Sequence, residues 1–157
     1  MTPAELKTIR ESLSLTAQWL ADHVGVKLRT VQYWEAGRAP VPADVSEFLL
    51  RIDATLEGAA QLALQVVDEK IKAGPAPRQV ALVRYRTDED LWRFRPDMQP
   101  LPATTHAVLL SRVRRGLWSR GVPSVIEYME PDQYLVWLDG RADSEAERAA
   151  WAVSINA

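Results

Sequence analysis

The chain has 157 residues, of which 47% are hydrophobic, with no cysteine and a formal net charge of −2 at pH 7. This size and apolar content fit one compact domain or two small ones. The absence of cysteine excludes disulfides and thiolate metal sites, and no apolar run is long enough for a membrane span, so we expect a cytoplasmic protein with no membrane contact.

A net charge this close to zero is not typical of a strongly basic nucleic-acid binder. The distribution of charge matters more than the sum, because phosphate contacts need only a local positive face. Such a face is predicted around residues 28–36. Lys27 precedes this segment, Arg29 lies near its start and Arg38 follows it.

The first helix is predicted to begin at a capping box, Thr2–Glu5, with proline at its first position. Leu6, Ile9 and Leu13 then follow at helical spacing. Thr16 is placed to cap a second helix, and Gly25 supplies a residue that turns with positive φ at little cost.

A third helix is predicted from about Leu28 to Ala36, closed by Gly37. Two short helices around a tight turn present the second of them outward, in a form that enters a DNA major groove. Their inward faces share an apolar character and comprise Leu20, Ala21, Val24, Val31 and Trp34.

A long fourth helix is predicted from about Pro42 to Ala73, either as one bent helix or as two, because Gly58 lies inside the pattern. Its apolar stripe is longer than the first three helices can cover. We therefore expect the remainder to pack on the C-terminal region or on a second subunit.

The segment Gly74–Pro77 reads as a linker, after which the pattern changes. The first predicted elements are a strand at 80–86, a short helical turn from Thr87, a loop at 98–102 and a helix at 103–120. A hairpin follows, with strands at 124–129 and 134–138 and its turn at 130–133. A capping box at 144–147 then predicts a final short helix. The sequence thus predicts a mainly α protein with three regions, namely a helix-turn-helix domain with a long connecting helix at 1–74, a small α+β domain for dimerisation at 75–141, and a tail at 142–157.

The segment Thr16–Gly37 resembles the lambda-repressor/Cro-like (Xre) helix-turn-helix family. The residues that carry this resemblance are Leu20–Ala21, Val24–Val26, Arg29–Val31 and Trp34–Gly37, with Ile9–Arg10 at the expected distance upstream. The resemblance implies that Glu35 pairs with Arg10 as a structural ion pair. Two positions depart from the family pattern, since Ala17 stands where glutamine is usual and Lys27 where a capping side chain is usual.

The sequence is also similar to the anti-CRISPR-associated (Aca) regulators, through Gln32–Glu35, Gly37–Arg38 and Val41–Val45, and more loosely through Leu82–Tyr85. This likeness implies a homodimer that represses its own operon from an inverted repeat. It also leaves RNA open as a second partner.

The outward side chains near the start of a recognition helix read the bases. We expect base contacts from Leu28, Arg29 and Gln32, where arginine suits guanine, glutamine suits adenine and leucine suits a thymine methyl. The expected contacts to the DNA backbone come from Gln18, Lys27, Thr30, Tyr33 and Arg38.

The predicted helix at 103–120 contains arginines and no acidic residue, which allows either a second nucleic-acid surface or a solvated face with salt bridges. These arginines are Arg112, Arg114, Arg115 and Arg120. His23 and His106 lack partners at ligand spacing, and no nucleophile or phosphate-loop motif occurs, so we expect no metal, no cofactor and no enzymatic activity.

The function favoured by the sequence is a DNA-binding transcriptional repressor that acts as a homodimer on an inverted repeat. One alternative is an antitoxin-type DNA-binding protein whose C-terminal half binds a partner protein. Another is an enzymatic or ligand-sensing C-terminal domain that the helix-turn-helix only localises.

Overall fold

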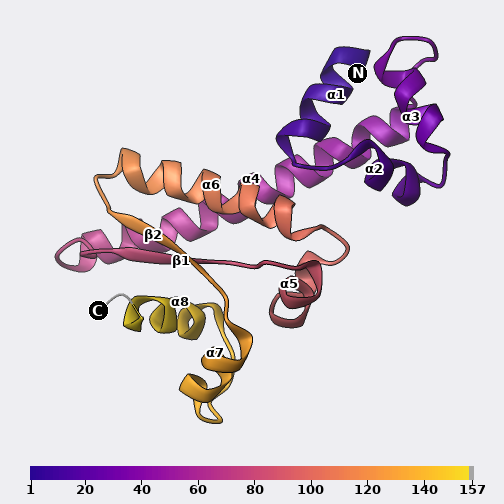
Figure 1. Ribbon diagram of the computed structural model, residues 1–157. Coiled ribbons are helices and arrows are strands. Elements are labelled where there is room, and N and C mark those ends of the chain that lie inside the picture. The colour runs from indigo at the N-terminus through magenta and orange to yellow at the C-terminus, as the bar shows by residue number, and fades with distance from the viewer. Residues whose placement is uncertain (156–157) are drawn as a thin grey trace. The chain divides into compact units, whose positions relative to one another are not determined.

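The computed structural model describes residues 1–155 and is mainly α-helical, which confirms the predicted fold class (Figure 1). The chain divides into two compact units, residues 1–59 and residues 60 onward. The long helix α4 (Ala43–Ala73) contributes its first part to the first unit and its remainder to the second. The predicted assignment of residues 75–141 to dimerisation stays a prediction.

The first unit contains α1 (Pro3–Ser12), α2 (Ala17–Val24), α3 (Leu28–Glu35) and the start of α4. Their ends lie where the sequence predicts them because the signals are local. The Thr2 hydroxyl and the Glu5 carboxylate form both bonds of the capping box, and Thr16 accepts a hydrogen bond from the Trp19 amide. Gly25 ends α2 in the left-handed region, with φ of 72°.

The core of the first unit is formed by the inward faces of these helices. Its fully buried side chains include Leu6, Leu13, Leu20, Val31 and Leu49. Since α1, α2 and α4 each supply part of this core, the outer face of α3 is left to solvent.

The second unit contains a two-stranded sheet with helices around it. Strand β1 (Val80–Arg84) pairs in parallel with β2 (Ser124–Tyr128), with Val80 opposite Ser124. Parallel neighbours need a crossover connection, and here α5 (Asp88–Phe94), a short 3₁₀ turn η1 (Pro96–Met98) and α6 (Ala103–Ser119) provide it. In Figure 1 the sheet lies between α6 and α8 (Glu145–Ser154), and both helices contact β1.

The prediction of a strand at 134–138 is wrong, because these residues belong to the helix α7 (Pro131–Leu138). Pro131 at the first helical position presets the φ angle of a helix. Tyr134 and Leu138, four residues apart, are buried, whereas Val136 between them is 81% exposed. A short apolar run fits both the two-residue period of a strand and the 3.6-residue period of a helix, so the sequence did not decide between them. The strand that pairs with β2 is β1 and not a second arm of a hairpin.

Aromatic side chains form one cluster within the core of the second unit, beside aliphatic residues such as Leu91 and Leu117. The rings of Tyr134 and Trp151 meet edge to face with centroids 5.8 Å apart, and Phe94 packs on Tyr134 at 5.6 Å. The Tyr134 hydroxyl donates to Asp143 at 2.6 Å, and the buried Arg148 donates to the same carboxylate and to the Phe94 carbonyl. These polar contacts satisfy groups that burial would otherwise leave unpaired.

Gly116 marks a close approach within the second unit, because a Cβ atom there would overlap the side chain of the buried Leu64 on α4. We expect Gly116→Ala to lower the free energy of unfolding by about 1–3 kcal/mol through overpacking. Gly58→Ala is the matched control, since a Cβ atom at Gly58 meets nothing within 4 Å. That change should raise stability by about 0.5–1 kcal/mol. Thermal denaturation of both variants measures this difference, and equal effects would contradict the close packing.

His106 is 3% exposed, and its Nδ1 atom has no hydrogen-bond partner among the described residues. Burial, and to a smaller extent the charge of Arg95, lowers the pKa of His106 from its ordinary value of 6.5 to about 4. Between these two pH values the unfolded chain binds more protons than the folded chain, so stability falls as the pH falls.

We expect this histidine to remove about 2 kcal/mol of stability between pH 7 and pH 5. The His106→Gln variant has no group at this position that titrates in this range, so it should lose less stability between pH 7 and pH 5. Urea denaturation of the two proteins at both pH values provides the measurement. A parallel loss in both proteins would show that His106 is not the titrating group.

Candidate nucleic-acid interface

Helix α3 presents one face to the core of the first unit and the other to solvent. Val31 is fully buried and Trp34 is 6% exposed, so both anchor the inner face. Lys27 precedes the helix in extended conformation and makes no capping hydrogen bond with its side chain. The first N–H groups of α3 are therefore left without a side-chain cap.

The outer face of α3 is part of a shallow groove. Six of the eight residues predicted to contact DNA line it, together with Ala36, which the sequence analysis did not single out. The six are Lys27, Leu28, Arg29, Gln32, Tyr33 and Arg38. The other two predicted contacts lie outside the groove, with Thr30 half-buried on α3 and Gln18 exposed on α2.

Tyr33 lies between the two arginines of this groove. Its hydroxyl accepts a hydrogen bond from Arg29 Nε at 2.5 Å. The guanidinium carbons of Arg29 and Arg38 lie 5.2 and 5.8 Å from the centre of the Tyr33 ring. The ring face attracts both cations, so Tyr33 holds two positive groups on one surface. Within residues 1–155 no hydrogen bond engages the two terminal nitrogens of Arg29, which therefore face solvent as free donors.

Gln18 is engaged within its own helix, since its side-chain Nε2 donates to the Asp22 carboxylate at 2.6 Å. This bond fixes the amide near an acidic group rather than near the cations of the groove. The amide carbonyl and a second N–H remain for another partner.

Arg10 and Glu35, the pair implied by the family resemblance, form a buried bidentate ion pair. Arg10 Nε and Nη2 donate to the two Glu35 oxygens at 2.6 and 3.2 Å, and the side chains are 9% and 11% exposed. Arg10 Nη1 donates to the Leu15 carbonyl at 2.7 Å. One guanidinium thus connects α1, the residue before Thr16 and the end of α3.

The four arginines predicted as a second basic surface differ in their exposure and in their ion pairing. Arg120 forms a bidentate pair with Asp68 at 2.7 and 2.9 Å, and its guanidinium lowers the pKa of that carboxylate. Arg112 is half-buried. Arg114 and Arg115 are exposed on α6 and make no ion pair or hydrogen bond with another described residue.

Neither a metal centre nor a membrane segment is found in the part of the chain that the structure describes. No group of three or more potential ligand residues of the His, Cys, Asp and Glu types converges there. None of its helices combines the length and hydrophobicity that crossing a membrane requires.

No protein-family model matches the chain. It is similar to a curated protein, the Aca2 repressor of Pectobacterium phage ZF40, with 35% identity over 79 residues. The match covers 50% of this chain and 65% of that repressor. The chain therefore spans less than two thirds of the length of the curated relative that it matches.

The buried pair generates a stability prediction. Arg10→Gln leaves the Glu35 carboxylate buried without its cation, so we expect the free energy of unfolding to fall by about 3 kcal/mol. Lys7→Gln on the same helix is the matched control, because Lys7 meets Glu11 at 4.0 Å with both side chains more than half exposed. That change should cost less than about 0.5 kcal/mol. Urea denaturation compares the two variants, and a loss of similar size in both would refute a structural role for the buried pair.

Proposed function

We propose that this chain is a sequence-specific DNA-binding transcriptional repressor that places α3 in the major groove of its operator. The observation that carries the proposal is the grouping of six predicted contact residues in one solvent-facing groove on α3. An α-helix fits the major groove, and its outward side chains then face the base edges. The similarity to the Aca2 repressor supports the same conclusion.

Arg29, Gln32 and Leu28 are proposed to read the bases. The free terminal nitrogens of Arg29 suit the O6 and N7 acceptors of guanine, while Nε stays bound to Tyr33. Gln32 is exposed one turn further along α3 and carries the donor and acceptor that match adenine. Leu28, at the start of the helix, offers an apolar contact for a thymine methyl.

Contacts to the DNA backbone are proposed at both ends of α3. Lys27 lies beside uncapped helix N–H groups, a combination that attracts a phosphate. Arg38 follows the helix and is held over the Tyr33 ring. Tyr33, Thr30 and Gln18 complete the proposed backbone contacts, of which Gln18 must share its amide with Asp22.

We further propose that two copies act together in the cytoplasm on an inverted repeat near the protein's own gene. Two-fold symmetry of a dimer demands two symmetric half-sites, spaced by about one helical turn of DNA or a multiple of it. Footprinting on the DNA upstream of the gene tests this proposal. Protection of a palindrome supports it, and uniform weak protection of every sequence contradicts it.

We expect Arg29→Ala to weaken operator binding by about 1–3 kcal/mol and to relax the preference at one base position. The reason is the loss of a bidentate contact that only one base satisfies. Fluorescence anisotropy with the operator and with single-base variants of it measures both effects. If affinity and base preference both survive, Arg29 does not read a base.

Lys27→Ala is the control for Arg29→Ala, because it removes one positive charge from the groove without removing a proposed base contact. It should weaken binding to operator and unrelated DNA alike and reduce the slope of affinity against salt concentration by about one. A base-specific effect of Lys27→Ala would instead mean that Lys27 reaches into the groove.

A further inference from the structure

A second concave surface lies on α6, in the second unit of the chain. It is a groove of about 470 Å³ lined by Ser111, Arg114, Arg115 and Trp118 of the helix and by Val122, Pro123 and Ser124 of the segment that leads into β2. The helix residues are spaced so that all four share one exposed stripe. The volume lies within the roughly 300–1,000 Å³ typical of small-molecule sites.

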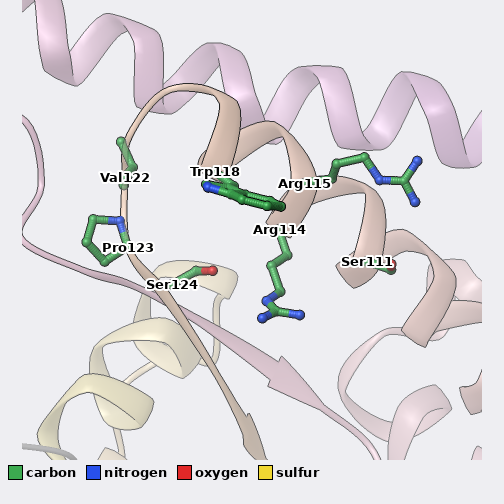
Figure 2. A pocket seen from close by; sticks show the side chains of 7 residues that line it. All are labelled: Ser111, Arg114, Arg115, Trp118, Val122, Pro123 and Ser124. Carbon is green, nitrogen blue, oxygen red and sulfur yellow. The ribbon is translucent and has the colours of Figure 1, made fainter.

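Trp118 is the most informative residue of this groove, because its side chain is 81% exposed. Its ring stacks on no other aromatic ring of the described chain. In Figure 2 the ring lies along α6, with Arg114 below it, Arg115 to its right and the Val122–Ser124 segment to its left. An exposed indole offers an apolar face on which a planar group can stack.

The two charged residues that line the groove, Arg114 and Arg115, are both positive. Arg114 and Arg115 have no acidic partner among the described residues, whereas Arg120, one turn further on, is neutralised by Asp68. Helix α6 itself contains no acidic residue. The groove therefore combines an exposed indole ring with two guanidinium groups that run in different directions from α6, Arg114 below the ring and Arg115 away to its right, and each can bind an anionic oxygen (Figure 2).

A second copy of this chain is a poor occupant of the groove. A two-fold symmetric contact sets the same surface of each copy against the other. Such a contact would bring the arginines of both copies into one interface to which α6 contributes no acidic residue, and like charges gathered in an interface oppose association. The occupant that the groove favours is planar and apolar in one part and anionic in another.

We propose that this groove binds a nucleotide, with the base stacked on Trp118 and the phosphate held by Arg114 and Arg115. Base-on-indole stacking with phosphate contacts from arginine is the chemistry by which proteins hold unpaired nucleotides. The Ser111 and Ser124 hydroxyls at the rim can donate to or accept from a sugar or base edge. The nucleotide can come from a free mononucleotide or from an unpaired stretch of a nucleic-acid strand, since both carry the same base and phosphate.

The test follows the indole N–H signal of Trp118 by NMR in the full chain. The chain has six tryptophans, and Trp118→Phe identifies this signal by its loss. AMP and a ten-nucleotide oligo(dA) are the two probes, with inorganic phosphate as the control that lacks a base. We expect AMP or the oligonucleotide, but not phosphate alone, to shift the Trp118 signal. A shift with AMP indicates a free nucleotide, and a shift with the oligonucleotide alone indicates a strand.

Variants then assign the binding energy. Isothermal titration calorimetry measures their affinity for the active probe, because Trp118→Ala removes the NMR signal. Trp118→Ala and the double variant Arg114→Gln/Arg115→Gln should each weaken binding of that probe by about tenfold or more. Val136→Ala and Arg78→Gln are matched controls, because Val136 is also 81% exposed and Arg78 is an exposed arginine outside the groove. Both controls should bind like the parent chain.

The proposal is overturned if neither probe moves the Trp118 signal, or if the groove variants and the controls bind equally. It is also overturned if the signal changes with protein concentration alone, since a second copy would then cover the ring. Operator binding is measured in parallel and should be unchanged in Trp118→Ala. The outcome for this groove is therefore distinguishable from the outcome for the proposed DNA contacts of α3.

Discussion

The buried ion pair between Arg10 and Glu35 is the contact on which the geometry of the first unit depends. Both side chains lose water, and the pair compensates through two parallel hydrogen bonds and a third to the Leu15 carbonyl. Buried pairs of this kind add little net stability, but separating the partners leaves a buried charge without compensation. Because Glu35 is the last residue of α3, the pair holds that helix against α1 and leaves its outer face in a fixed position.

This fixed position explains how a nearly neutral chain can present a cationic surface. Glu35 lies within the third helix, but Arg10 neutralises it on the inner side. Lys27, Arg29 and Arg38 remain on the outer side, where Tyr33 gathers the two arginines. The formal charge of −2 therefore says little about the field at this groove, which depends on which charges are paired internally.

Internal ion pairing also divides the arginines of the second unit into two groups. Arg120 and Arg148 are committed to carboxylates and stabilise the fold, whereas Arg114 and Arg115 are left for an external partner. In both units an aromatic ring stands beside the unpaired cations, Tyr33 on α3 and Trp118 on α6. The two rings differ in exposure, since Tyr33 is half-buried and serves its own arginines while Trp118 faces solvent.

The sequence by itself determined the helices of the first unit, because caps such as Thr2 and Thr16 and the glycine turn at Gly25 act over three or four residues. It also pointed to Arg10 and Glu35 through the family resemblance. Only the tertiary structure decided that residues 134–138 are helical, that β1 and β2 pair in parallel, and that Arg120 is neutralised while Arg114 is not. The strand pairing and the Arg120–Asp68 pair each join residues more than 40 positions apart, and local spacing carries no information about such pairings.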